Sequence, residues 1–193
     1  AVFMNPIFKS SQNAGYGPEF YKQIEHSFGN RQAFMELAKA LHERGMYYML
    51  DVVLTFVAVY DIWYNKENRN PLPAAAPDWA SEYHDFFYFT GEEGDTTSYK
   101  SDWGGVKLNF NSEKLRDFIY RAKDSYLKYY CENPFHADAL RFDCGGSISG
   151  TREDGTPIKD WEILGEIRKH LHEINPNIML LSEYSFSRSV EKG

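Results

Sequence analysis

The sequence predicts an α/β fold in which a parallel sheet alternates with helices. Four short runs are almost entirely apolar and are bounded by turn residues, the pattern of strands buried on both faces. They cover 1–4, 46–53, 137–143 and 177–183. Amphipathic helical patterns lie between them, and this alternation favours parallel strands. With 193 residues, the chain is long enough for one domain with a sizeable core.

Three helices are expected between the strands. The first covers 31–45 and ends at Gly45, because glycine commonly terminates a helix. Its apolar face is formed by Phe34, Leu37, Ala38 and Leu41. The second covers 112–130 and begins at Ser112, a favoured N-cap residue. Its apolar face is formed by Leu115, Ile119, Ala122 and Tyr126. The third covers 160–174 and is ended by "NPN".

The segment 57–111 interrupts this alternation. It is rich in proline, glycine, aspartate and aromatic residues, as in "NPLPAAAP", "YHDFFYF" and "SDWGG". A connection this long within a compact domain is usually functional or forms a small subdomain. We therefore expect one domain over 1–193, with 57–111 inserted into it.

Composition and charge exclude several classes of function. The net charge is −7, from 21 basic and 28 acidic residues, and no basic run is present, so nucleic acid is not an expected partner. No stretch approaches the ~20 apolar residues that a membrane span needs. The chain starts within a strand pattern and shows no basic-then-apolar leader, which indicates a piece of a longer protein and favours a cytoplasmic location over secretion.

Cysteines and histidines predict no metal or disulfide site. The two cysteines, Cys131 and Cys144, form neither a disulfide framework nor a metal-binding pair, and Cys144 fits a small buried thiol. The six histidines lack metal-ligand spacing. "CGGSISG" follows a strand but matches no phosphate-binding glycine motif.

Carboxylates end two of the predicted strands. Arg141 and Asp143 are two apart and therefore point to the same face, and Glu183 ends the next strand. The C-terminal ends of parallel strands carry the sites of such folds. Neighbouring strands lie about 4.8 Å apart, which would separate the two carboxylates by roughly 5 to 6 Å. Retaining glycosidases need about 5 to 5.5 Å, whereas inverting enzymes need about 6.5 to 9.5 Å.

The surroundings of these carboxylates suggest different roles. Arg141 should favour the ionised form of Asp143, as a nucleophile requires, and Glu183, between the apolar "IMLL" and Tyr184, should hold its proton as an acid. The same residues also fit a buried Arg–Asp ion pair with a glutamate that caps a helix. The residues alone leave both interpretations open.

Four segments resemble, in order and spacing, the α-amylase family (glycoside hydrolase family 13). They are "NPIFKSSQNAGYGPEFYKQIEHSFG", "HERGMYYMLDVV", "ADALRFD" and "LLSE". The resemblance implies a partial TIM (β/α)8 barrel, strands two to five, with 57–111 as a domain-B-like excursion after the third strand. It also implies a retaining hydrolase or transglycosylase for α-glucosidic bonds of starch-like glucans or maltooligosaccharides.

The resemblance also implies roles for five residues. Asp143 matches the nucleophile and Glu183 the general acid/base. Arg141 matches the arginine that orients the nucleophile, and Tyr16 matches the tyrosine that stacks on the sugar at the cleavage point. Asp51 matches the aspartate that closes the third strand in the substrate site.

Several positions depart from the family pattern. Thr55 and Phe56 replace the Asn-His pair that usually follows the third strand, so no calcium site and no cofactor are expected. Gly17 replaces an aspartate, and Gly146 and Ser147 replace a Lys-His pair. The segments that would carry the third catalytic carboxylate and the remaining barrel strands are not matched. The open sheet edges are expected to pair with those strands or with another chain.

Two other functions fit parts of the sequence. The changed positions favour a catalytically impaired family member that binds glucan or a protein partner, whereas Asp143 and Glu183 oppose it. An unrelated doubly wound α/β enzyme could present similar strand ends, and the order of four matching segments opposes that interpretation.

Overall fold

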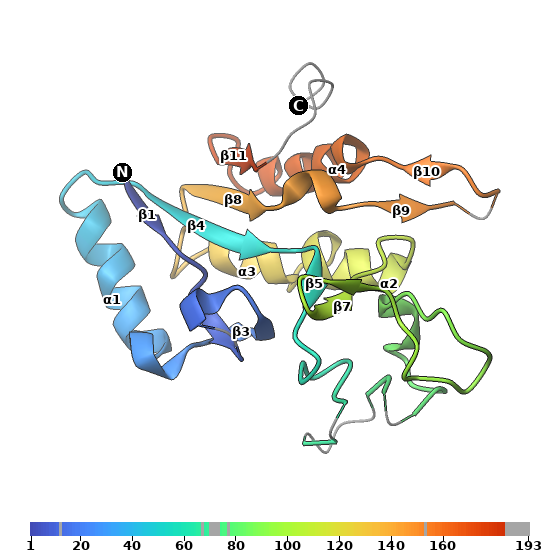
Figure 1. The fold of residues 1–193 in the computed structure, drawn as a ribbon. Coiled ribbons are helices and arrows are strands. Elements are labelled where there is room, and N and C mark those ends of the chain that lie inside the picture. Colours follow the sequence, from blue (N-terminus) through green and yellow to red (C-terminus); the bar gives the residue numbers. More distant parts are fainter. Residues whose placement is uncertain (12, 67, 70–73, 77, 153, 184–193) are drawn as a thin grey trace.

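The centre of the molecule is a parallel four-stranded sheet (Figure 1). The structure, a computed structural model, describes residues 1–11, 13–66, 68–69, 74–76, 78–152 and 154–183. The sheet order is β1-β4-β8-β11 and every neighbouring pair is parallel. Its strands are β1 (Val2–Met4), β4 (Tyr48–Val53), β8 (Ala139–Asp143) and β11 (Met179–Ser182). All four predicted strands are confirmed, and so is the α/β fold class.

The register of the sheet brings polar residues onto one face. Asp51 of β4 lies opposite Arg141 of β8, and Leu181 of β11 lies opposite Arg141 on the other side. Because side chains alternate along a strand, the intervening residues point to the other face. Those residues join the buried core and include Leu50, Val52, Leu140 and Phe142. The sheet therefore has one face packed on helices and one face that carries charge.

Helix α1 (Arg31–His42) confirms the first predicted helix. Asn30 caps it by accepting a hydrogen bond from the backbone N–H of Ala33 at 3.0 Å. Gly45, three residues beyond the end, adopts a φ of 67°, which lets the chain turn back toward β4. The prediction that Leu37 belongs to the buried face is wrong, because Leu37 is 46% exposed. Leu37 lies at the edge of the apolar stripe, whose centre is Phe34, Ala38 and Leu41.

The predicted helix over 112–130 is wrong as a continuous element. It forms α2 (Glu113–Arg116), a π-helical turn (Asp117–Arg121) and α3 (Tyr126–Cys131). The break comes at Ala122, whose ψ of 154° is extended. Ser112 does cap the first part, because its hydroxyl accepts from the Leu115 N–H at 3.2 Å.

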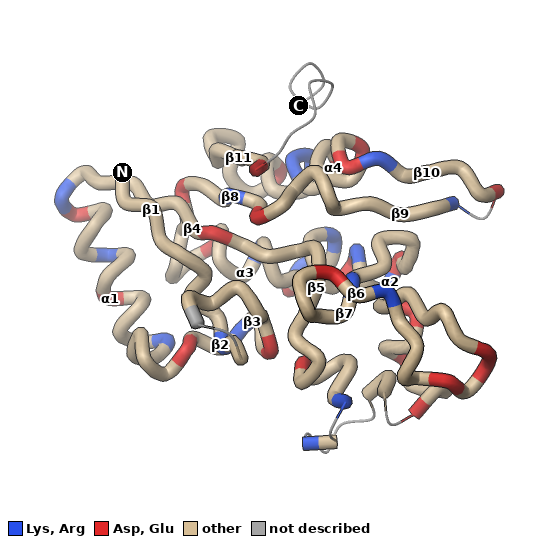
Figure 2. The backbone as a smooth tube through the Cα atoms, in the orientation of Figure 1, with Lys and Arg blue, Asp and Glu red and all other residues tan. Residues whose placement is uncertain are grey.

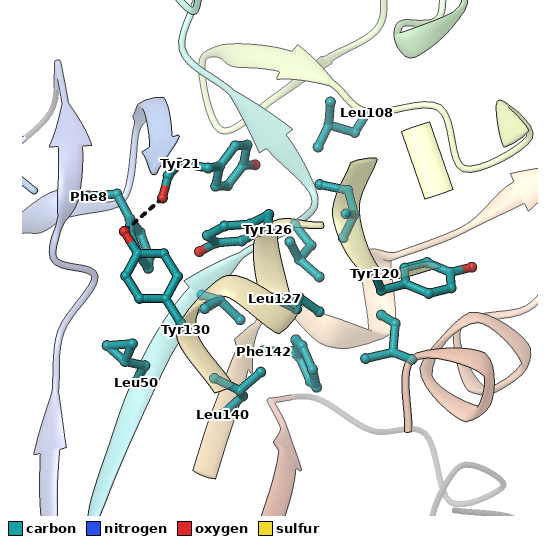
Figure 3. Packing of buried hydrophobic residues seen from close by; sticks show 14 of the residues in the cluster. Phe8, Tyr21, Leu50, Leu108, Tyr120, Tyr126, Leu127, Tyr130, Leu140 and Phe142 are labelled. Atoms are coloured by element: carbon teal, nitrogen blue, oxygen red, sulfur yellow. Dashed lines mark hydrogen bonds between the residues drawn. The ribbon is translucent and has the colours of Figure 1, made fainter. Parts of the chain in front are cut away.

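Aromatic packing explains the break after Ala122. The turn aims α3 at an antiparallel hairpin of β2 (Phe8–Ser10) and β3 (Pro18–Ile24). There Tyr126 packs on Tyr21, with ring centroids 4.5 Å apart, and on Phe8 at 5.3 Å. The Tyr130 hydroxyl donates to the Tyr21 carbonyl oxygen at 3.1 Å (Figure 3). Burial of these rings against the hairpin outweighs the lost helical hydrogen bonds.

The segment 57–111 contains a second small sheet. Its strands are β5 (Phe56–Val57), β6 (Ser101–Asp102) and β7 (Gly105–Lys107), in the order β5-β7-β6. β5 begins three residues after β4 ends, so this sheet starts at the C-terminal end of the parallel sheet. A further hairpin, β9 (Gly150–Thr151) with β10 (Pro157–Ile158), follows β8.

Helix α4 (Asp160–His172) leads from this hairpin toward β11 and confirms the third predicted helix. Short 3-10 turns cover Asn13–Gly15, His26–Phe28, His84–Phe86 and Gly145–Ser147. Among the described residues, no helix has the length and apolarity needed to cross a membrane.

Candidate active site

Arg141 is the centre of a cluster of three carboxylates from three neighbouring strands. Its Nη1 donates to both carboxylate oxygens of Asp51, at 2.8 and 2.7 Å, and to Oδ1 of Asp143 at 2.8 Å. Its Nη2 lies 2.6 Å from Oε2 of Glu183. Figure 2 shows the corresponding acidic segments within β4 and at the ends of β8 and β11, beside a basic segment of β8. The structure therefore brings four of the five predicted site residues together directly.

Asp51 lies deepest in this cluster and connects it to Tyr16. Asp51 is fully buried within β4, two residues before the end of the strand, so it does not close the strand as the resemblance implied. The Tyr16 hydroxyl donates to Oδ2 of Asp51 at 2.7 Å. Burial raises the pKa of both groups, and in Tyr16 the hydrogen bond to Asp51 raises it further. Tyr16 is the fifth predicted site residue, and it joins the cluster through Asp51.

Asp143 and Glu183 stand side by side at the ends of adjacent strands. The backbone N–H of Glu183 donates to the carbonyl of Phe142 at 3.0 Å, which continues the β8–β11 ladder to the end of β8. One carboxylate oxygen of each residue lies within 4.8 Å of the other. The nearest carboxylate oxygens of the pair are therefore closer than the roughly 5 to 6 Å expected from strand spacing alone.

The expected protonation preferences of this pair are reversed in the structure. Burial raises the pKa of Asp143, and the nearby charges of Asp51 and Glu183 raise it further, against the opposing effect of Arg141. The backbone N–H of Cys144 and the guanidinium of Arg141 hold the pKa of Glu183 below its usual range. Arg141 does favour the ionised form of Asp143, as predicted, but burial of Asp143 outweighs this effect on its pKa. The pKa of Glu183 differs from the prediction because the Cys144 N–H and Arg141 both contact its carboxylate.

That backbone donor depends on the turn after β8. Cys144 has a φ of 46°, and its N–H donates to Oε2 of Glu183 at 3.0 Å. A Cβ on the following Gly145 would lie 2.1 Å from the Ser182 hydroxyl, so this close approach favours glycine. Cys144 is partly exposed, in contrast to the buried thiol expected from the sequence. Burial raises the pKa of Cys144 to about 11, so its thiol is protonated at neutral pH.

Positions that depart from the family pattern are used for packing. Thr55 is buried, and its hydroxyl makes no hydrogen bond within the described part of the chain. Phe56 is buried and pairs with Lys107 in the small sheet. Gly17 donates its N–H to the Ser10 hydroxyl at 3.1 Å and so helps to close the β2–β3 hairpin. Tyr184 lies outside the described residues.

Within the described ranges, one group of side chains has the composition of a metal site: Asp143, Cys144 and Glu183. Arg141 already pairs with both of its carboxylates, so a cation would compete with an internal positive charge. The expectation that the protein needs no cofactor stays a prediction.

Comparisons with known proteins agree with this arrangement. The family model of the alpha amylase catalytic domain matches residues 1–191. The chain is 27% identical to an amylopullulanase of Thermoanaerobacterium saccharolyticum, over 77% of this chain and 13% of that protein. It is 24% identical to an oligo-1,6-glucosidase of Bacillus cereus, over 92% of this chain and 33% of that protein. The chain thus spans about a third or less of these relatives.

Solved structures show the same fold. An alpha-amylase from H. orenii superposes with a TM-score of 0.74 at 22% identity, covering 99% of this chain and 40% of the amylase. The type III pullulan hydrolase from Thermococcus kodakarensis superposes with a TM-score of 0.72 at 23% identity, covering 94% of this chain and 29% of the hydrolase. The family match over residues 1–191 shows that the chain belongs to the α-amylase family of glycoside hydrolases.

Proposed function

We propose that this chain supplies the nucleophile and the acid/base of a retaining glycoside hydrolase or transglycosylase that acts on α-glucosidic bonds. One observation carries the proposal: Asp143 and Glu183 lie on adjacent strand ends with carboxylate oxygens within 4.8 Å, and Arg141 pairs with both. The names of the relatives, an amylopullulanase and an oligo-1,6-glucosidase, support starch-like glucans or maltooligosaccharides as substrates.

In the proposed reaction, the carboxylate of Asp143 attacks the anomeric carbon while Glu183 gives its proton to the departing glycosidic oxygen. The bond to the leaving sugar breaks and a glycosyl ester with Asp143 forms. Glu183, now ionised, takes a proton from water or from an acceptor sugar hydroxyl, whose oxygen displaces Asp143. Arg141 stabilises the ionised form of Asp143 in both steps.

Substrate binding must change the protonation of Glu183 for this reaction to start. In the structure without substrate, the Cys144 N–H and Arg141 favour ionised Glu183. A sugar that displaces water from the site would desolvate this carboxylate, and desolvation raises the pKa of a carboxyl group. We infer that Glu183 becomes protonated, and can act as the general acid, only when a glycosidic oxygen lies beside it.

We also propose that the parallel sheet corresponds to strands two to five of a (β/α)8 barrel, with 57–111 as its domain B. Exposed apolar residues on the charged face of the edge strands support this assignment. They are Phe3 of β1 and Met179 and Leu181 of β11. Further strands, from the same protein or from another chain, would cover them and complete the sheet.

The same assignment predicts weak activity for the 193-residue chain alone. The third carboxylate of the family is not matched here, and loss of one group that stabilises developing charge typically costs about 10² to 10³ in rate.

Covalent labelling with a 2-fluoro glucosyl fluoride tests the proposal. The electron-withdrawing fluorine slows both steps, and the fluoride leaving group removes the need for a proton from Glu183, so the glycosyl ester accumulates. Intact mass and peptide mapping should find the adduct on Asp143, and Asp143→Asn should not react. Absence of the adduct from folded chain would oppose the catalytic proposal and favour a glucan-binding role.

A further inference from the structure

Trp103 stands at the tip of the β6–β7 hairpin and is 72% exposed. The chain has four tryptophans, and the other three are buried or half-buried. A single exposed apolar residue is common on protein surfaces and by itself indicates nothing. The backbone and the location of Trp103 are what make it unusual.

The backbone conformation of this hairpin turn disfavours tryptophan. Asp102 pairs with Gly105, so the loop consists of two residues, Trp103 and Gly104. Their φ values are 48° and 79°, the pattern of a type I′ turn. Asparagine, aspartate or glycine is favoured at the first of these positions, and a bulky side chain there is a conformational outlier. The backbone of Trp103 adopts an unfavourable conformation while most of the residue stays exposed, which points to a role outside the hairpin.

The insertion that carries this hairpin contacts the chain just after β4 and in the loop after β8. The N–H of Leu108, just after β7, donates to the carbonyl of Thr55, just after β4, at 3.1 Å. The Tyr88 hydroxyl of the same insertion donates to the carbonyl of Ser149, in the loop after β8, at 3.4 Å. The negative charge of Asp102 also contributes to the raised pKa of Cys144, the residue next to Asp143. These contacts connect the small sheet to the ends of β4 and β8.

We propose that Trp103 is a platform for an α-glucan sugar ring at the rim of the site, beyond the ring that Asp143 attacks. The inference rests on the proposed function and assigns a binding position to the inserted sheet. The apolar C–H face of a pyranose packs on an indole ring, and such contacts dominate the energetics of aromatic-rich sites. Asp102, adjacent to Trp103 and partly exposed, adds a carboxylate that can accept hydrogen bonds from sugar hydroxyls.

Two substitutions at Trp103 distinguish the contribution of the aromatic ring from the effect of the turn conformation. Trp103→Asn removes the ring and places a favoured residue in the turn, so the hairpin should remain folded. Trp103→Tyr keeps a smaller ring. Tyr47→Ala serves as the matched control, because Tyr47 is 65% exposed and precedes β4, at the opposite end of the sheet from the carboxylates. Circular dichroism and thermal unfolding verify that every variant is folded.

Calorimetric titration with maltoheptaose measures binding, and the one-ring fluoride probe measures labelling of Asp143. We expect Trp103→Asn to lose at least about tenfold in affinity for maltoheptaose, Trp103→Tyr to lose less, and Tyr47→Ala to bind as the unchanged chain does. We expect all three variants to react with the probe at the unchanged rate, because one ring does not reach the rim.

Several results would overturn the inference. Equal affinity of Trp103→Asn and the unchanged chain would show that the ring does not bind sugar, and labelling of Asp143 would then leave the proposed function intact. An equal loss in labelling and in affinity would show that the substitution disturbs the whole site. No binding of maltoheptaose by the folded chain, or self-association that depends on Trp103, would also reject a sugar platform.

Discussion

Replacement of Arg141 by methionine tests whether this residue holds the carboxylate cluster together. Asp51 is fully buried and accepts two hydrogen bonds from Arg141, at 2.8 and 2.7 Å. Loss of one partner from a buried ion pair costs about 3 to 5 kcal/mol, because the other charge stays buried without compensation. The pairs with Asp143 and Glu183 are partly exposed, and each adds no more than about 1 kcal/mol. We therefore expect Arg141→Met to lower the free energy of unfolding by about 3 to 5 kcal/mol at neutral pH.

The sign of the pH dependence follows from the carboxyl groups. The folded state already raises the pKa of Asp51 and of Asp143, and removal of the cation raises both further. A carboxyl group whose folded pKa lies above its unfolded value stabilises the protein below the unfolded pKa of about 3.9, and this contribution is lost as the pH rises. The loss caused by Arg141→Met should therefore be largest near neutral pH and should shrink toward pH ~4.

Urea unfolding followed by circular dichroism, at about pH 7 and about pH 5, measures both effects. Arg44→Met is the control, because Arg44 is exposed and donates to the carbonyl of Ala40; its effect should stay within about 0.5 kcal/mol. A loss below about 1 kcal/mol for Arg141→Met, or an equal loss at both pH values, would refute the reasoning.

Three further substitutions test separate parts of the structure. Asp51→Asn removes a charge that raises the pKa of Asp143, so the acid limb of the pH profile for labelling by the fluoride probe should move to lower pH; an upward shift would contradict this. Tyr126→Phe removes a buried hydroxyl that has no partner within the described residues, so urea unfolding should show equal or higher stability, and a loss above about 1 kcal/mol would reveal a missing partner. A Cβ at Gly105 would lie 2.3 Å from the Phe56 ring, so Gly105→Ala should lower the free energy of unfolding by about 1 to 3 kcal/mol. The substitution should also make 57–111 more sensitive to limited proteolysis, and an unchanged digest would argue against tight packing there.

The sheet could be predicted from the sequence because its signals are local. The four strands are short apolar runs, and the same-face placement of Arg141 and Asp143 needs only the alternation of side chains. Those two rules also placed Glu183 beside Asp143. The long helix was mispredicted at Ala122 because the contacts that favour the break come from Phe8 and Tyr21, about a hundred residues earlier.

Electrostatics within the site could not be predicted in the same way. The sequence places Arg141 near Asp143 but does not show that its second nitrogen reaches Glu183. It also does not show that Cys144 adopts a positive φ and aims its N–H at Glu183. Both contacts depend on how the turn after β8 meets the end of β11, which is a property of packing between segments about 40 residues apart.

The connection between the two central strands, β4 and β8, is the longest in the parallel sheet. Met49 of β4 pairs with Ala139 of β8, 90 residues later, whereas Val2 pairs with Tyr48 after 46 residues and Ala139 pairs with Met179 after 40. Since closure entropy grows only with the logarithm of loop length, the longer connection costs about 0.6 to 0.7 kcal/mol more than the shorter ones. The closure entropy therefore adds little to the cost of an insertion between these two central strands. Because such insertions begin at the end of β4, beside Asp143 and Glu183, they can change the surroundings of the proposed substrate site while the register of these two carboxylates stays the same.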